Sequence, residues 1–153
     1  MEFKRSQFLP ISLSEAWKFF SSPHNLSKIT PEELNLKIIG KFRESGIEQG
    51  DLIDYKVKPL LNIPMNWKTE ITYVNAPHCF VDEQLKGPYR VWKHTHQFEE
   101  VAGGTMVYDH VIYELPFQPF SRLMLPIVKK KIQAIFDYRE IQMNKVFSRN
   151  GAI

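Results

Sequence analysis

The sequence has little cysteine and no long apolar run, and each shortage excludes a class of protein. Cys79 is the only cysteine among 153 residues, so no disulfide can form within the chain and a reducing, cytoplasmic location is expected. No apolar run approaches the roughly 20 residues that span a membrane, so stable membrane insertion is not expected. The segment from Met1 to Arg5 is charged where a secretory signal would be apolar.

The sequence also has no large excess of positive or negative charge. The formal net charge is only +3, and Lys129-Lys130-Lys131 is the one run of basic residues. Nucleic-acid binding needs clustered Arg and Lys beside exposed stacking aromatics, a pattern that is missing here, so no nucleic-acid partner is expected. The chain also lacks a Gly-x-Ser-x-Gly nucleophile motif, a phosphate-binding glycine loop and a dinucleotide fingerprint, and no cofactor is predicted.

The apolar content of the chain predicts a folded protein. The residues are 43% hydrophobic and 13% aromatic, which excludes disorder. A chain of this length is expected to form one domain over residues 1–153 and to bury roughly 70% of its unfolded surface.

The first third of the chain contains clear start and stop signals for short elements. A first strand is expected at 3–9, where Pro10 ends it. Ser12 and Glu15 form a capping box that predicts a helix. Pro23 stops this helix and opens a second short one, which is expected to run through about Ile29.

The middle of the chain reads as a series of strands separated by turn residues. Six strands are expected after the short helices, at 34–41, 51–58, 65–75, 78–86, 90–99 and 105–115. Consecutive strands joined by short turns pair as antiparallel hairpins.

The last quarter of the chain has the period of one long helix. Apolar residues recur at spacings of three and four from about Ser121 to Ser148. Pro126 removes a helical hydrogen bond, so it predicts either a kink or a short leading turn with the main helix beginning near Leu125. One helix can cover a seven-stranded antiparallel sheet only if the sheet curves around it. The predicted fold is therefore α+β, a helix-grip arrangement with an internal cavity.

One strand carries an unusual face. Trp92, His94, His96 and Phe98 share one parity, and residues of one parity lie on the same side of a sheet. Burying an unpaired polar group costs roughly 2 to 7 kcal/mol, so two imidazoles on an inward face need polar partners or a space that a ligand enters. This face predicts the wall of a pocket.

The neighbouring strand offers Asp109 and Tyr113 as partners of the histidines. A turn centred on Ala102-Gly103 places His96 opposite Asp109, whereas a turn centred one residue later places His94 opposite Tyr113. An inward aspartate beside imidazoles is held ionised and fixes the tautomer of the ring. The group either performs acid–base chemistry, recognises the polar end of a ligand, or forms a satisfied structural network.

Other residues are candidates for the same pocket. Arg139 is placed at the margin of the helix stripe, where a salt bridge to Asp109 or Asp82 is the favoured role and binding of a ligand carboxylate the alternative. The spacing of His94 and His96 suits two metal ligands, with Asp109 or Tyr113 as the third. Two histidines and one aspartate are common without a metal, so no metal is predicted.

Several strings of the chain resemble one known group of proteins. They are Phe80-Val81-Asp82-Glu83-Gln84, the run from Gly87 to Phe98, Gly103-Gly104-Thr105, the run from Asp109 to Tyr113, and the run from Ile135 to Arg139. These strings resemble the SRPBCC ligand-binding proteins of the START/Bet v 1-like superfamily, which includes polyketide cyclases and lipid-transfer domains. The resemblance implies a helix-grip fold with a cavity for an apolar small molecule. It implies no single reaction, because this fold hosts binders, carriers and enzymes, and the family is not metal-dependent.

The expected function is a carrier or sensor that binds an apolar or aromatic small molecule between the sheet and the long helix. The residues expected to contact the ligand are Tyr55, Trp67, Trp92, His94, His96, Phe98, Asp109, Tyr113 and Arg139. The alternative is a cyclase- or dehydratase-like enzyme that uses His94, His96 and Asp109 for acid–base chemistry. A third possibility is a partner-binding module that exposes the apolar segment 116–126. The residues indicate no particular oligomeric state.

Overall fold

The strands form one antiparallel sheet. Within residues 1–59 and 63–148, which the computed structural model describes, the sheet has seven strands in the order β1-β7-β6-β5-β4-β3-β2. The strands are β1 (Glu2–Leu9), β2 (Lys37–Ile39), β3 (Leu52–Val57), β4 (Met65–Asn75), β5 (Cys79–Lys86), β6 (Val91–Val101) and β7 (Gly104–Glu114). All pairs except β1 with β7 join strands that are consecutive in the chain, as the series of hairpins predicts.

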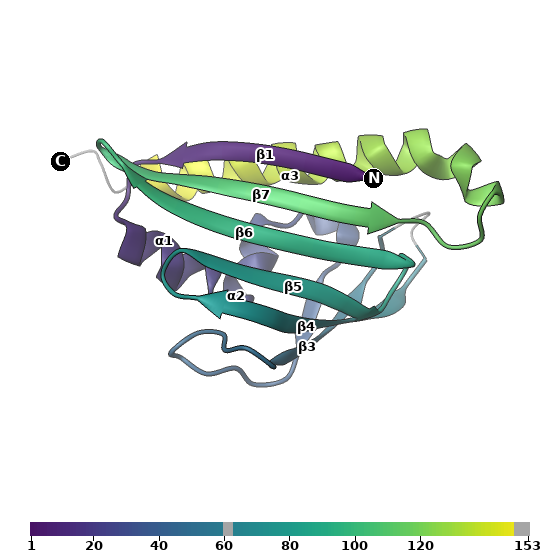
Figure 1. Cartoon of the computed structure of the whole chain (residues 1–153), viewed down its shortest axis with the longest axis horizontal. Coiled ribbons are helices and arrows are strands. Elements are labelled where there is room, and N and C mark those ends of the chain that lie inside the picture. The colour runs from purple at the N-terminus through teal and green to yellow at the C-terminus, as the bar shows by residue number, and fades with distance from the viewer. Residues whose placement is uncertain (60–62, 149–153) are drawn as a thin grey trace.

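The helices lie together on one side of this sheet (Figure 1). Between β1 and β2 the chain forms α1 (Leu13–Phe20), α2 (Pro23–Leu26) and the 3-10 turns η1 (Ser27–Ile29) and η2 (Glu32–Leu34). After β7 it forms the 3-10 turn η3 (Phe120–Met124) and the long helix α3 (Leu125–Ser148), which runs along β1. The result is a helix-grip fold, as predicted. No helix among the described residues has both the length and the apolar character to cross a membrane.

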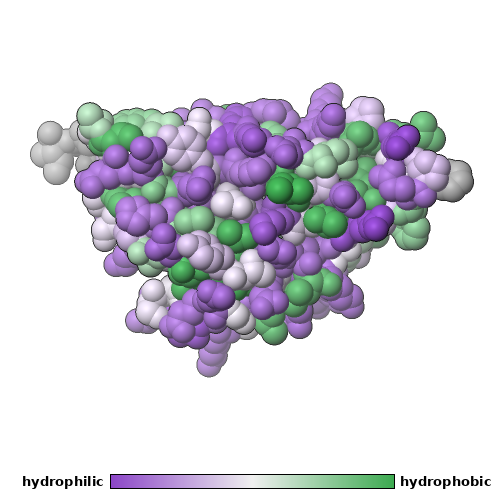
Figure 2. Space-filling view, in the orientation of Figure 1, coloured by the Kyte–Doolittle hydropathy of each residue, from purple (hydrophilic) through white to green (hydrophobic). Residues whose placement is uncertain are grey.

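The opposite side of the sheet faces solvent. Figure 2 shows this face as mostly hydrophilic, with apolar residues scattered over it. On β6 the outward residues are Lys93, Thr95 and Gln97, whereas His94, His96 and Phe98 are buried on the side of the helices. The interior of the protein therefore lies between the sheet and the helices.

The start of α1 confirms the predicted capping box. The backbone N–H of Glu15 donates to Oγ of Ser12 at 3.2 Å, and the backbone N–H of Ser12 donates to Oε2 of Glu15 at 2.9 Å. These bonds satisfy N–H groups that the first turn of a helix leaves without partners.

Ser12→Ala is expected to lower the free energy of unfolding by about 1 kcal/mol, because the substitution removes the side-chain acceptor at the N-cap. Urea unfolding followed by circular dichroism measures this change. Ser14→Ala, on an exposed position two residues into the same helix, is the matched control and should cost nothing. Equal losses for the two variants would show that the box does not stabilise α1.

Pro126 separates a short turn from the main helix, as one of the two sequence predictions states. The 3-10 turn η3 ends at Met124, and α3 begins at Leu125. The buried face of α3 has the predicted spacing, and its members are Val128, Ile132, Phe136, Arg139, Met143 and Phe147. Arg139 is thus inside the apolar stripe, not at its margin.

The apolar core is divided into two clusters. One contains Phe98, Val107 and Met143, and the other contains Val111 and Phe136. On β7 the residue between the clusters is Asp109, and on α3 it is Arg139. Polar residues of the sheet and of the helix therefore meet at the boundary between two apolar cores.

One strand of the sheet is shorter than predicted, and one turn has the first of two predicted registers. The strand expected at 34–41 is only Lys37–Ile39, because η2 occupies the segment before it and Asn35 and Gly40 adopt positive φ angles of 44° and 113°. The β6–β7 turn has the first of the two predicted registers, in which His96 pairs with Asp109.

The segment at 116–126 keeps part of its apolar surface exposed. Phe117 and Leu123 are 84% and 83% exposed. The hypothesis that this segment binds a protein partner stays a prediction.

Candidate functional site

A cavity of about 180 Å³ lies between the sheet, α3 and the segment from α1 to η2. Most of its wall is apolar, with side chains from each of these elements: Phe19, Phe20, Leu26, Ile29, Ile53, Ile71, Ile132 and Ile135. An apolar cavity of about 150 Å³ in another protein holds benzene, so this one has room for at least an aromatic ring. The polar side chains that line it are Ser22, Asn25, Thr30, Tyr55, Thr69, Asp82, Tyr89, His94, His96, Lys131 and Arg139.

Two buried histidines form part of this wall. His94 and His96 follow each other on the inward face of β6, with exposed fractions of 6% and 7% and ring centroids 3.7 Å apart. Alternation along the strand places both rings on the helix side of the sheet. His96 also stacks on Phe80 of β5, with centroids 4.2 Å apart.

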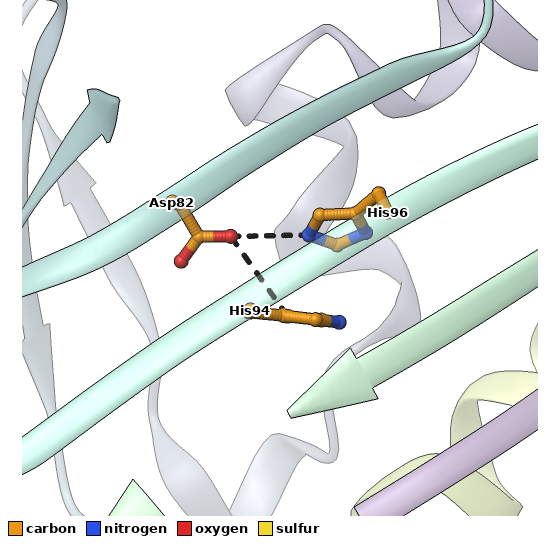
Figure 3. Close-up of side chains that lie close together, drawn as sticks. All are labelled: Asp82, His94 and His96. Atoms are coloured by element: carbon orange, nitrogen blue, oxygen red, sulfur yellow. Dashed lines mark hydrogen bonds and ion pairs between the residues drawn. The ribbon is translucent and has the colours of Figure 1, made fainter. Parts of the chain in front are cut away.

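A carboxylate stands on each side of the histidine pair. Asp82 lies on β5 directly opposite His94, and Asp109 lies on β7 directly opposite His96. Strand β6 lies between β5 and β7, and each of these neighbours contributes one carboxylate to the pair of imidazoles. Figure 3 shows Asp82 approaching both rings from β5.

The hydrogen bonds in this cluster define where the ring protons are. A carboxylate only accepts, so Nε2–H of His94 donates to Oδ1 of Asp109 at 2.7 Å, and Nε2–H of His96 donates to Oδ2 of Asp82 at 3.1 Å. Nδ1 of His96 is 3.2 Å from Oδ1 of Asp109, but the two groups are not aligned for a hydrogen bond. Nδ1 of His94 is 3.8 Å from Oδ2 of Asp82.

These contacts move the pKa values of the cluster in opposite directions. Burial acts to raise the pKa of Asp109, but its close contacts with His94 and His96 outweigh burial and hold that pKa far below its usual value. Burial and the charge of His96 lower the pKa of His94. For His96, burial acts to lower the pKa, but Asp109 and Asp82 outweigh it and raise the pKa above its usual value. The pKa of His96 is therefore above that of His94, so when the pair carries one positive charge, His96 is the charged imidazole.

Arg139 brings a second positive charge from α3. The side chain is 7% exposed, and its guanidinium carbon is 4.8 Å from the centroid of the Phe136 ring. Burial lowers the pKa of Arg139, while the charges of Asp109 and Asp82 act to raise it. Two carboxylates, the imidazolium of His96 and this guanidinium sum to zero, so the cluster is electrically balanced.

The salt bridge predicted from Arg139 to Asp109 or Asp82 is wrong. The ion pairs of these carboxylates, over the part of the chain that the structure describes, all go to His94 and His96. Nε of Arg139 is buried without a hydrogen-bond partner. The ion pairs of both carboxylates go to the histidines of the central strand, so Arg139 forms none with them.

Several residues on the cavity wall have buried polar atoms without a hydrogen-bond partner. Among the described residues, six buried side-chain polar atoms have no hydrogen-bond partner, and four of them belong to cavity-lining residues. These four are Nε1 of Trp67, Oγ1 of Thr69, Nδ1 of His96 and Nε of Arg139. Buried polar groups in proteins are nearly always paired, so a group of exceptions around one cavity requires an explanation.

The structure brings most of the predicted site residues to the cavity. Tyr55, Trp67, Trp92, His94, His96 and Arg139 line it. Three predicted ligand contacts do not line it. Phe98 packs edge-on against Trp17 in one core cluster, Tyr113 packs near Tyr89 and Trp92, and Asp109 lies behind the histidines.

Sequence reasoning missed Asp82 as a site residue and as the third potential metal ligand. Asp82, His94 and His96 each offer one ligand atom, and these atoms lie within 4.8 Å of one another. Asp109 and Tyr113, the expected third ligands, do not take this place. The available signal was parity on β5, because Asp82 is two residues from the buried Phe80 and so shares its inward face.

Comparisons with known proteins identify the fold. No family model matches the chain, and no curated protein matches it in sequence. Solved structures match it over nearly its whole length at low identity, so the likeness concerns the fold alone. Protein Ms6760 from Mycobacterium smegmatis is 14% identical, with 97% of this chain and 92% of that chain covered and a TM-score of 0.71.

Two further matches are named proteins. Norcoclaurine synthase from Thalictrum flavum is 15% identical, with 99% of this chain and 96% of that chain covered and a TM-score of 0.69. Ara h 8.0201 is 14% identical, with 95% of this chain and 98% of that chain covered and a TM-score of 0.59. The chain has the same fold as these proteins, in agreement with the helix-grip fold that the resemblance in its sequence implied.

Proposed function

We propose that this chain is a cytoplasmic carrier or sensor that binds an apolar or aromatic small molecule in the cavity between the sheet and α3. The apolar wall takes the body of the ligand, and the polar wall around His94, His96 and Arg139 takes its polar end. One observation carries this proposal. The cavity of about 180 Å³ has a mostly apolar wall that also includes His94, His96 and Arg139, the combination that small-molecule sites in proteins usually have.

The neutrality of the cluster supports an uncharged ligand when no metal is present. Adding a carboxylate to a buried, balanced group of charges costs desolvation energy, and the other cation on the cavity wall, Lys131, is only half-buried. A carbonyl, ether or hydroxyl oxygen accepts from the guanidinium without this cost. We therefore expect a ring-sized apolar molecule with a neutral acceptor at one end.

Binding of N-phenyl-1-naphthylamine, an uncharged aromatic dye that fluoresces in apolar surroundings, tests this function. We expect saturable binding of one dye per chain, with energy transfer from Trp67 and Trp92, which line the cavity. A fluorescence increase that stays linear with dye concentration, without energy transfer, would count against a binding cavity.

A specific observation favours an enzyme as the second candidate. The neutral His94 has Nε2–H held by Asp109, so its Nδ1 lone pair is available as a general base next to the imidazolium of His96. Such a pair suits removal of a proton beside a carbonyl group. Exchange of the methyl protons of acetophenone in deuterated buffer, followed by proton NMR, tests this chemistry. We expect faster exchange with the protein than with buffer and its loss in His94→Gln; equal rates in the three samples would exclude the enzyme.

A further inference from the structure

The cavity wall contains three side chains whose ligand atoms converge on one point. Oδ2 of Asp82 is 3.1 Å from Nε2 of His96 and 3.8 Å from Nδ1 of His94. We propose that Asp82, His94 and His96 form a binding site for a divalent transition-metal ion. Two imidazoles and one carboxylate are a ligand set that zinc and its neighbours in the first transition row accept.

The distances are close to those that a metal requires. Bonds of about 2.0 to 2.1 Å at tetrahedral angles place ligand atoms roughly 3.3 Å apart. The observed separations of 3.1 and 3.8 Å from Asp82 differ from this by a few tenths of an ångström. The ligand atoms of all three residues lie within 4.8 Å of one another, so the side chains have to rotate toward a common point to close the site.

Asp109 is the independent observation that points to a metal. It approaches the opposite nitrogens of the same two rings, Nε2 of His94 at 2.7 Å and Nδ1 of His96 at 3.2 Å. Nε2–H of His94 donates to Asp109 and leaves Nδ1 of that ring free to offer a lone pair. On His96 a metal at Nε2 would displace the proton that this nitrogen donates to Asp82, and the ring would then carry its hydrogen on Nδ1, which faces Asp109. In metal proteins, a coordinating histidine usually donates its other N–H to such a carboxylate. Here Asp109 accepts from Nε2 of His94 and stands 3.2 Å from Nδ1 of His96.

The open side of the proposed site faces the cavity. Asp82, His94 and His96 line the cavity, whereas Asp109 does not. Three protein ligands leave at least one coordination position for another molecule, as in catalytic zinc sites. The metal would therefore contact whatever occupies the cavity.

The nearby charges define which group completes the coordination. The charges of the cluster besides the imidazoles are two carboxylates and the guanidinium of Arg139, which sum to −1, so a divalent ion with two neutral imidazoles brings their total to +1. The half-buried Lys131 on the cavity wall adds a further positive charge. An anionic oxygen, such as a carboxylate or a phenolate, then balances the site. The metal would change the preferred ligand of the cavity from a neutral acceptor to an anion.

Zinc binding is tested with the metal alone, so its result is independent of dye binding and of the proposed carrier function. The chain is stripped with a chelator, dialysed and titrated with Zn²⁺ in a calorimeter. We expect one Zn²⁺ per chain, a loss of at least 100-fold in affinity for His96→Ala and Asp82→Asn, and a loss of about 10- to 100-fold for Asp109→Asn.

His110→Ala is the matched control, because His110 pairs with Glu2 away from the cavity and its loss should leave zinc affinity unchanged. Circular dichroism of each variant verifies folding, and the visible spectrum of bound Co²⁺ gives a second readout. A tetrahedral Co²⁺ spectrum that His96→Ala abolishes supports the site. No Zn²⁺ binding by the wild type, or equal affinity in His96→Ala and His110→Ala, would overturn it.

Discussion

Asp109→Asn is expected to lower the free energy of unfolding by about 3 to 5 kcal/mol at neutral pH in the presence of a chelator. The substitution keeps the shape of the side chain but removes a charge that faces two imidazoles, at 2.7 and 3.2 Å. In the variant, the carboxylate of Asp82 is the only one left to balance the imidazolium of His96 and the guanidinium of Arg139. Removing one partner of a buried ion pair costs this much because the remaining charge is left uncompensated.

Urea unfolding of the wild type and the variant measures the loss. Asp54→Asn is the control, because Asp54 forms an ion pair with Lys68 at 3.4 Å and its side chain is half exposed. Surface ion pairs contribute about 0 to 1 kcal/mol, so the control should remain within that range. A loss below 1 kcal/mol for Asp109→Asn would mean that the cluster is not charged as described.

Ile135→Trp is expected to lower the affinity of the cavity for N-phenyl-1-naphthylamine by at least tenfold. Ile135 lies on α3, is half-buried and contributes to the cavity wall. A large indole at this position enters the cavity and occupies the volume that the dye needs. Because the residue is only partly buried, the new side chain has room to adjust, and the cost in stability should stay within about 1 to 3 kcal/mol.

Dye titration of two further variants gives this prediction its controls. Ile141→Trp places the same side chain on the exposed face of the same helix, where Ile141 is 53% exposed, and it should leave the affinity unchanged. Ile135→Phe should reduce the affinity by an intermediate amount. Equal binding by Ile135→Trp and Ile141→Trp would show that the dye binds outside the cavity.

The fold was predictable because its main determinants are local patterns. Ser12 and Glu15 define the start of α1, Pro126 the division between η3 and α3, and alternation along 90–99 the inward face of β6. The superfamily resemblance came from longer strings and led to the same fold. Strand β2 was overestimated because Asn35 adopts a left-handed conformation that residue identity alone does not specify.

The site was only partly predictable, because its geometry depends on the direction in which each side chain leans and on the contacts that it makes in the folded protein. Strand pairing places His96 opposite Asp109, but the shortest hydrogen bond runs diagonally from His94, since side chains lean along a strand. Asp82 was not predicted as a site residue, because the alternation along β6 alone does not show which residue of β5 lies opposite His94. Helical spacing placed Arg139 at the margin of the stripe, and only the packed structure reveals it as buried and unpaired.

The most direct test of ligand binding is to identify what the protein carries in the cells that make it naturally. The wild type and Ile135→Trp are purified in parallel without detergents, and native mass spectrometry is followed by solvent extraction and analysis of the extract. The cavity predicts one ring-sized apolar compound near one equivalent per wild-type chain, reduced at least tenfold in Ile135→Trp. A wild-type chain that carries nothing, or two proteins that carry the same compound in equal amounts, would contradict it.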